Sequence, residues 1–321
     1  MPHYRTRRIA PLLALGALIG LAACQDNVSP NAFREADQPA LSAAKAVVST
    51  PADRAARLAE RANTRLAARG SKFRVAGATF FTVGRGVPAF RQLRTGARWP
   101  DASNLTYLID ASGITHDAPQ GAVINALVNA FESWDAVPRV SVGLTRVPDT
   151  HANPDLLDVI TRNQAGECVD FSDPAWQGPY ADIVVGGWLG EDYFSDCLGS
   201  SDIIAVTWYF TDVDSNHDNF ADLVYAEQYF NDAWGYVTSG SQYLDFDGPF
   251  DVQSIEVHEL GHALGLGHFG GPNPNQPFTI KPNGRVFDPE AVMNPFSLGG
   301  EKRDLLPTDL AALRSLYARS H

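Results

Sequence analysis

Residues 258 to 268 read His-Glu-Leu-Gly-His-Ala-Leu-Gly-Leu-Gly-His, and this stretch decides both the local structure and the chemistry that we expect. On a helix, His258 and His262 stand four residues apart and therefore lie on the same face. Gly265 stands where that helix must end, because a residue without a Cβ atom adopts the left-handed conformation readily. The chain then turns back and brings His268 beside the first two histidines. The spacing predicts three imidazole ligands around one metal ion.

Glu259 directly follows the first histidine, and we expect it to act as a catalytic base. Three protein ligands leave one tetrahedral position of a zinc ion open, which is the arrangement of a catalytic zinc and not of a structural one. A zinc-activated water in that position would lose a proton near neutral pH, and Glu259 would accept that proton and deliver it to the leaving group. The sequence therefore predicts one Zn2+ and metal-assisted hydrolysis without a covalent intermediate.

The complete pattern HExxHxxGxxH resembles the zinc motif of the metzincins, and within them that of the matrixins, the family of the matrix metalloproteinases. The segment Ala291-Val292-Met293-Asn294-Pro295 is similar to the family's Met-turn, in which Met293 would form an apolar floor beneath the metal. Arg98-Trp99-Pro100 resembles the start of the matrixin domain, and the resemblance covers about residues 98 to 318. It implies a zinc-dependent metalloendopeptidase with an α+β metzincin fold. That fold has a twisted, mostly parallel five-stranded sheet, a zinc-binding active-site helix and a C-terminal helix.

The same resemblance implies where a protein or peptide substrate would bind. Residues Ile204 to Thr207 would form the edge strand of the sheet, and an extended peptide would add to it through main-chain hydrogen bonds. Pro295 and Phe296 would line a selectivity pocket with an apolar preference. No cysteine precedes the domain in the setting that the family uses for latency, so it stays open whether residues 25 to 97 inhibit the enzyme.

Two other functions are compatible with the same ligands. One is a lipid-anchored, zinc-containing surface protein that binds a partner without turnover. The other is a zinc hydrolase that acts on something other than peptides. Glu259 favours an enzyme over the first alternative, since a protein without turnover needs no carboxylate there. The strand-like edge of the expected cleft favours peptides over the second.

The N-terminus predicts export. Three arginines among the first eight residues precede an uncharged run over residues 9 to 23, which is the layout of a secretory signal peptide. The run ends in Leu21-Ala22-Ala23-Cys24, which is similar to the lipobox of bacterial lipoproteins, in which Cys24 would be lipidated and anchor the chain to a membrane. An ordinary cleavage site with an incidental cysteine is the alternative. We expect an outer-membrane lipoprotein or cell-surface protein, or else a secreted one.

These observations divide the chain into a lipoprotein signal peptide (1–23), a tether with a candidate pro-segment (24–97) and a matrixin-like metallopeptidase domain (98–321). Apolar periodicity predicts helices over about residues 51–70, 120–136 and 307–319, and strands over residues 181–185, 203–210 and 223–230. The formal net charge of −12 argues against nucleic acid as a partner.

Two further sites are expected outside the zinc motif. Cys168 and Cys197 remain once Cys24 is assigned to the lipobox, and we expect them to pair because disulfides persist in exported proteins. One loop carries oxygen-bearing side chains at nearly every second position, as loops that wrap Ca2+ do: Asp212, Asp214, Asn216, Asp218 and Asp222. This loop has no glycine at its turn and no closing glutamate, so a calcium site and a solvated hairpin tip are both open interpretations.

Overall fold

The computed structural model describes residues 50–83, 96–114, 118–149, 160–162, 168–170, 179–212, 216–239, 248–269, 271–272, 287–288, 290–297 and 299–318. These residues all belong to one compact unit, which begins at Val48. The predicted signal peptide, Cys24 and Asp214 lie outside the described residues. Among the helices described, none combines the length and the apolar character that crossing a membrane requires.

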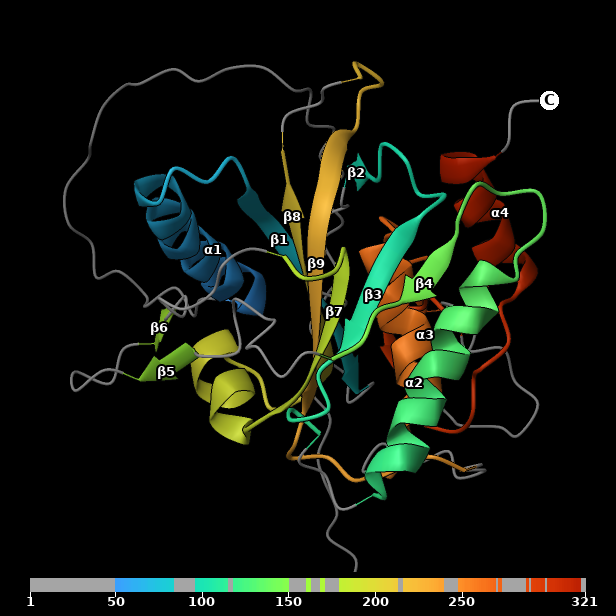
Figure 1. Cartoon of the computed structure of the whole chain (residues 1–321). Helices are drawn as coiled ribbons and strands as arrows, with labels where there is room; N and C mark the ends of the chain where they lie inside the picture. Colours follow the sequence, from blue (N-terminus) through green and yellow to red (C-terminus); the bar gives the residue numbers. More distant parts are fainter. Residues whose placement is uncertain are drawn as a thin grey trace, which may run out of the picture. The chain divides into compact units, whose positions relative to one another are not determined.

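The fold is α+β, and its main element is a mixed, mostly parallel sheet with helices on both faces (Figure 1). The strands follow the order β14-β1-β8-β9-β7-β3-β4, and β2 also pairs with β9. All pairings are parallel except those of β1 with β8 and of β8 with β9. The strand bounds are β1 Arg74–Val83, β2 Ala97–Arg98, β3 Leu105–Ile109, β4 Leu144–Arg146, β7 Ile183–Leu189, β8 Ile203–Thr211, β9 Ala221–Asn231 and β14 Phe296–Ser297. The predicted α+β class with a mostly parallel sheet is confirmed.

Helices and short ribbons complete the described structure. The helices are α1 Pro51–Ala68, α2 Gln120–Asp135, α3 Val252–Ala263 and α4 Pro307–Tyr317, with a single π-helical segment, η1 Tyr193–Leu198. The ribbons pair β5 Ile160–Arg162 with β6 Cys168–Asp170, β10 Tyr236–Val237 with β11 Phe250–Asp251, and β12 Gly271–Pro272 with β13 Phe287–Asp288. The helices predicted over residues 51–70, 120–136 and 307–319 are confirmed within two residues at each end.

The two faces of the sheet bury separate apolar clusters. On one face, Leu127 and Trp134 of α2 pack with Leu260 of α3 in a cluster that also includes residues of α4. On the other face, Leu58 of α1 and Phe194 of η1 belong to a second cluster with apolar side chains of β8 and β9. The helix that carries the histidines is therefore buried between the sheet and α2, which fixes its position.

The expected position of β8 at the sheet edge is wrong. Strand β1 pairs antiparallel with β8 from Arg74 opposite Thr211 to Thr82 opposite Ile203, so β8 has a neighbour on both sides. An unpaired edge exposes a row of backbone N–H and C=O groups, and β1 satisfies that row. The sequence 74–83 is rich in β-branched and aromatic residues that suit this position. The sheet consequently has more strands than the five expected: β1 and β14 extend the run β4-β3-β7-β9-β8 beyond β8, and β4 forms the opposite edge.

Candidate metal centre

Helix α3, which carries His258 and His262, begins and ends as its local sequence dictates. Asp251 caps its first turn, since its side chain accepts the backbone N–H of Ser254 at 2.8 Å. After its last residue the chain turns at Gly265, which has φ +87°. The N–H groups of Gly265 and Leu266 donate to carbonyls of the final turn at 2.8 and 2.9 Å, which is the bonding pattern of a Schellman motif. A Cβ atom at Gly265 would also lie 2.6 Å from the carbonyl oxygen of Ala97, so the turn has no room for a side chain.

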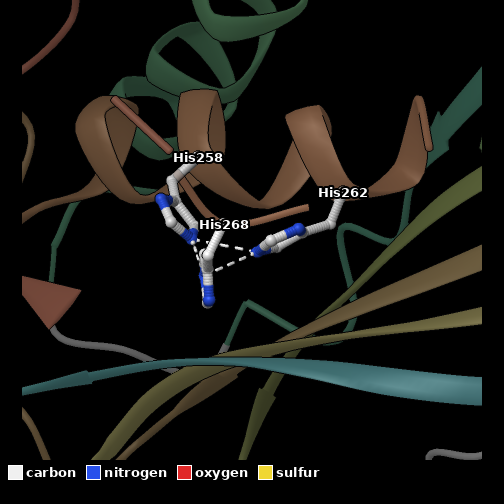
Figure 2. A group of neighbouring side chains, drawn as sticks. All are labelled: His258, His262 and His268. Carbon is white, nitrogen blue, oxygen red and sulfur yellow. Dashed lines mark hydrogen bonds between the residues drawn. The ribbon is translucent and has the colours of Figure 1, made fainter. Parts of the chain in front are cut away.

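The three histidines converge as the spacing predicts (Figure 2). His258 and His262 project from one face of α3, and His268 reaches the same point from the chain beyond the turn. Each Nε2 lies 3.0 Å from each of the other two, so the nitrogens form an equilateral triangle. His258 and His262 have no exposed surface, and His268 is half-buried.

Backbone carbonyls determine which ring nitrogen carries the proton. His258 Nδ1 lies 2.8 Å from the carbonyl oxygen of Val292, and His262 Nδ1 lies 2.9 Å from that of Leu266. A carbonyl oxygen only accepts, so each Nδ1 carries the hydrogen and each Nε2 of the neutral ring presents a lone pair. Two lone pairs 3.0 Å apart with no proton between them repel each other. The arrangement therefore favours a cation between the rings.

Burial keeps these rings in the neutral form that binds metals. Loss of solvation lowers the pKa of His262 to about 4, and it lowers the pKa of His258 and His268 well below the usual value, with mutual repulsion adding to both. At neutral pH no protons compete with a metal for the three nitrogens.

The triangle has dimensions that fit one metal ion. With sides of 3.0 Å its corners lie about 1.7 Å from its centre, so an ion slightly out of the plane meets metal–nitrogen distances of about 2.0 to 2.1 Å. Among the described residues, this is the group of histidine, cysteine and acidic side chains whose ligand atoms lie close enough together to hold an ion. The three histidines could therefore hold a metal ion.

Glu259 lies beside this cluster and is fully buried. The hydroxyl of Thr207 on β8 donates to Glu259 Oε2 at 2.5 Å, whereas Oε1 has no hydrogen-bond partner in the described part of the chain. Burial raises the pKa of Glu259 to about 8, and the hydrogen bond from Thr207 opposes this shift. A carboxyl with a pKa in this range can take up and release a proton near neutral pH.

Met293 lies directly beneath the metal-binding helix. It is fully buried, and a Cβ atom at Gly261 of α3 would collide with its Sδ. The glycine between the first two histidines therefore lets the methionine approach the helix backbone. The turn that contains Met293 and Asn294 is hydrogen-bonded to Phe269, the residue that follows His268. The Phe269 N–H donates to the Met293 carbonyl at 2.9 Å, and Asn294 Nδ2 donates to the Phe269 carbonyl at 2.9 Å.

Asp309 was not singled out by the sequence, although it supports the site. Its buried carboxylate accepts the backbone N–H groups of Val292 at 2.9 Å and Met293 at 3.2 Å, besides that of Leu306 at the start of α4. The acidic residue in the first turn of a helix is a visible capping signal. Its hydrogen bonds to Val292 and Met293 arise from tertiary packing, so no local pattern in the sequence predicts them.

Aromatic side chains fix the position of α3 from outside the site. Trp134 Nε1 donates to a carbonyl within the helix at 2.8 Å, and Trp99 Nε1 donates to the Ala263 carbonyl at 2.8 Å. The Tyr317 hydroxyl donates to the Leu264 carbonyl at 2.9 Å. The bond from Trp134 holds the middle of α3, and the other two hold the end from which the chain turns towards His268.

The acidic loop is only partly described. Asp218 pairs with Arg98 at 2.5 Å and accepts the backbone N–H of Phe220 at 2.9 Å, so it serves the structure of the loop. Asn219 adopts a left-handed φ of 70° where a calcium loop would carry glycine. In the described part of the loop, Asp212, Asp218 and Asp222 do not form a cluster that could share an ion. The calcium site stays a prediction.

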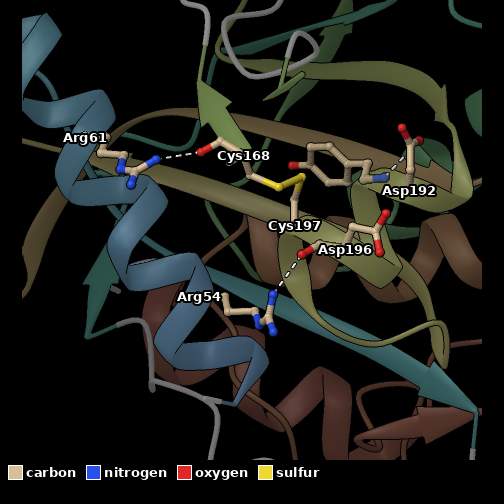
Figure 3. Close-up of a disulfide and its surroundings, with 7 residues drawn as sticks. Arg54, Arg61, Cys168, Asp192, Asp196 and Cys197 are labelled. Carbon is tan, nitrogen blue, oxygen red and sulfur yellow. Dashed lines mark hydrogen bonds between the residues drawn. A yellow bond between two sulfur atoms is a disulfide. The ribbon is translucent and has the colours of Figure 1, made fainter. Parts of the chain in front are cut away.

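Cys168 and Cys197 are joined by a disulfide between β6 and η1, with their Cα atoms 5.4 Å apart (Figure 3). Helix α1 packs beside this bond. Arg61 donates to the Cys168 carbonyl at 2.6 Å, and Arg54 donates to the Asp196 carbonyl at 2.8 Å. The disulfide region therefore anchors the N-terminal helix.

No protein-family model matches this chain, and no curated protein matches it either.

Proposed function

We propose that this protein is a zinc-dependent metalloendopeptidase of the metzincin type. The observation that carries the proposal is the triangle of three Nε2 atoms at 3.0 Å, with two rings held by carbonyls so that their lone pairs face inward. Histidine nitrogens in this number suit zinc and leave one position for a water or a substrate oxygen. The extended motif, the buried Met293 and the helix-ending Gly265 support the same proposal.

The bound zinc would supply Lewis-acid polarisation of a substrate carbonyl and acidify a water molecule. Glu259 would accept the proton of that water at its carboxylate and donate it to the departing amine nitrogen. The Thr207 hydroxyl fixes Oε2, so Oε1 is the oxygen left to handle the proton. The carbonyls of Val292 and Leu266 keep the first two histidines in the metal-binding tautomer.

The substrate that suits this site is a polypeptide in extended form. Strand β8 runs along the site, and its Thr207 contacts the catalytic carboxylate, so a strand paired with β8 passes close to Glu259. Main-chain pairing tolerates many sequences and needs few side-chain contacts. The predicted lipid anchor at Cys24 would place this activity at a membrane surface.

Hydrolysis of an unfolded protein tests the proposal. The zinc-loaded full chain is expected to cleave it, whereas Glu259→Gln should bind zinc with unchanged stoichiometry and lose at least about 10³-fold in rate, since proton transfer in the transition state contributes about 10² to 10⁴. Glu301→Gln changes an exposed carboxylate and serves as the matched control. Equal rates for Glu259→Gln and the unsubstituted chain would refute the role of Glu259. Zinc binding without cleavage by any form would favour the binding protein without turnover.

A further inference from the structure

Strand β1 lies where an extended substrate would bind. It runs antiparallel to β8 along its whole length and parallel to β14 at Thr82 opposite Phe296 and Val83 opposite Ser297. It thus bridges the sheet and the segment that follows Met293. These are the two rims of the cleft that the proposed function requires, and the chain's own backbone fills the space between them.

Phe81 makes the closest contact of β1 with the metal ligands. Its ring stacks on that of His258, with centroids 3.9 Å apart and planes inclined by 20°. The side chain is 6% exposed and lines a small pocket with Ile255 and Val292, among others. Figure 2 shows the first two histidines projecting away from α3, on the side where the strands of the sheet pass. An aromatic side chain of this chain therefore covers the ring of His258 from the side of β1.

The same strand lies over the catalytic carboxylate. Thr79 pairs with Thr207, whose hydroxyl donates to Glu259. Glu259, His258 and His262 have no exposed surface in this arrangement. Because β1 already pairs with β8 beside these residues, a polypeptide substrate cannot pair with β8 there while β1 is in place.

Residues 51–83 also have an attachment remote from the metal site. Arg54 and Arg61 of α1 donate to carbonyls beside the disulfide, and the Asn63 side chain both donates to and accepts from the backbone of Val75 at the start of β1. One end of β1 is therefore held by α1, and the other end covers His258. Such a segment can remain attached to the protein while its C-terminal half leaves the cleft.

We propose that β1 is an intramolecular ligand of the substrate cleft, which keeps the site closed and which substrate must displace, with Phe81 stacked on His258 where an aromatic side chain of the substrate would otherwise lie. This inference rests on the proposed function, because it assigns the cleft to a peptide. It requires no cysteine, unlike the latency device of the family that the motif resembles. A competing ligand binds only the open molecules. Its apparent affinity therefore falls in proportion to the fraction of molecules that are open.

Phe81 and Phe194 provide a matched pair of variants for the test. Both are buried phenylalanines, but Phe81 on β1 stacks on His258, whereas Phe194 of η1 lies outside β1 and belongs to the cluster on the α1 side of the sheet. The probe is a dipeptide hydroxamate with a phenylalanine side chain, whose binding to the zinc-loaded full chain is measured by calorimetry and does not depend on turnover. Phe81→Ala is expected to bind it at least about tenfold more tightly than the unsubstituted chain, and Phe194→Ala within about twofold.

A second measurement needs no substitution. In the unsubstituted zinc-loaded chain, saturating hydroxamate should accelerate amide hydrogen exchange in residues 79–83 and leave residues 123–131 of α2 unchanged. Equal hydroxamate affinity for both variants, or binding without faster exchange in residues 79–83, would overturn the proposal and make β1 a permanent strand. Tighter binding by Phe81→Ala without any hydrolysis of unfolded protein would support the closed cleft and refute the peptidase.

Discussion

Asp309 accepts a hydrogen bond from the backbone N–H of Val292 at 2.9 Å, and the Val292 carbonyl in turn lies 2.8 Å from His258 Nδ1. A residue near the C-terminus therefore orients His258 through a single intervening residue, Val292. When a residue that orients a metal-ligating histidine is removed, metal affinity typically falls by about 10- to 100-fold.

Asp309→Asn should weaken both the fold and the metal site. The amide keeps one acceptor oxygen and places an NH2 group against a backbone N–H, so at least one buried donor loses its partner at a cost of about 1 to 3 kcal/mol. We expect that loss in urea unfolding, together with zinc affinity about 10- to 100-fold lower. Asp304→Asn, at an exposed position of the same segment, is the control. Equal zinc affinity in the two variants would contradict the role of Asp309.

Gly261 should not tolerate alanine although it lies within a helix. Alanine is the better helix former by about 1 kcal/mol. The added methyl group would, however, collide with Met293 Sδ, and overpacking of this kind costs about 1 to 3 kcal/mol. Gly121 in α2 has open space around it, so Gly121→Ala should stabilise the protein by up to about 1 kcal/mol. Denaturant midpoints of both variants measure this, and a stabilised Gly261→Ala would show that Met293 does not press on the helix.

The metal-free protein should lose stability as the pH rises from 6.5 to 8. Burial raises the pKa of Glu259 from 4.5 to about 8, so the folded chain retains a proton that the unfolded chain has released. Glu259 therefore contributes its full stabilisation of the folded state below pH 4.5. This contribution to the free energy of unfolding is lost as the pH rises to about 8. Across the window from 6.5 to 8 the change is about 2 kcal/mol.

Glu259→Gln isolates this effect. Glu256 shifts in the same direction as Glu259, and the three histidines, whose pKa is lowered from 6.5, shift in the opposite direction, but all four are present in both proteins and the comparison removes their contribution. Chelator-treated samples are unfolded in urea at pH 6.5 and 8. The variant should become more stable than the unsubstituted protein as the pH rises, and parallel curves would exclude a raised pKa of Glu259.

Removal of the disulfide should destabilise the protein by about 3.5 kcal/mol at 25 °C, because the bond closes a loop with a sequence separation of 29. The double substitution Cys168→Ser with Cys197→Ser removes it without adding a new charge. Chemical reduction of the unsubstituted protein should give the same free energy of unfolding within error. A loss below about 1 kcal/mol would mean that the fold holds the two positions together without the bond.

The convergence of the three histidines could be predicted from the sequence because their geometry is local. His258 and His262 share a helix face, and Gly265 turns the chain three residues before His268, so no long-range contact is needed to bring the three rings together. The apolar periodicity of α2 and of β9 is likewise visible in short windows. These elements follow from rules that operate over fewer than about 18 residues.

The position of β1 could not be predicted in the same way. Its sequence favours a strand, but the strand beside which it lies is more than 120 residues away in the chain. The periodicity of a sequence does not indicate which strands pair. The role of Thr207 has the same origin, because a hydroxyl within a buried strand gives no sign of the carboxylate that it contacts. The pairing of β1 with β8, on which the proposed closed cleft rests, is therefore visible only in the three-dimensional structure.

X-ray absorption at the zinc edge tests the central claim most directly, namely that His258, His262 and His268 hold one zinc ion and leave a position open. The account predicts one zinc per chain, with three imidazole nitrogens at about 2.0 to 2.1 Å and one further oxygen ligand, and loss of stoichiometric binding in His262→Ala. A sulfur ligand, four protein nitrogens, or full zinc occupancy in His262→Ala would contradict it.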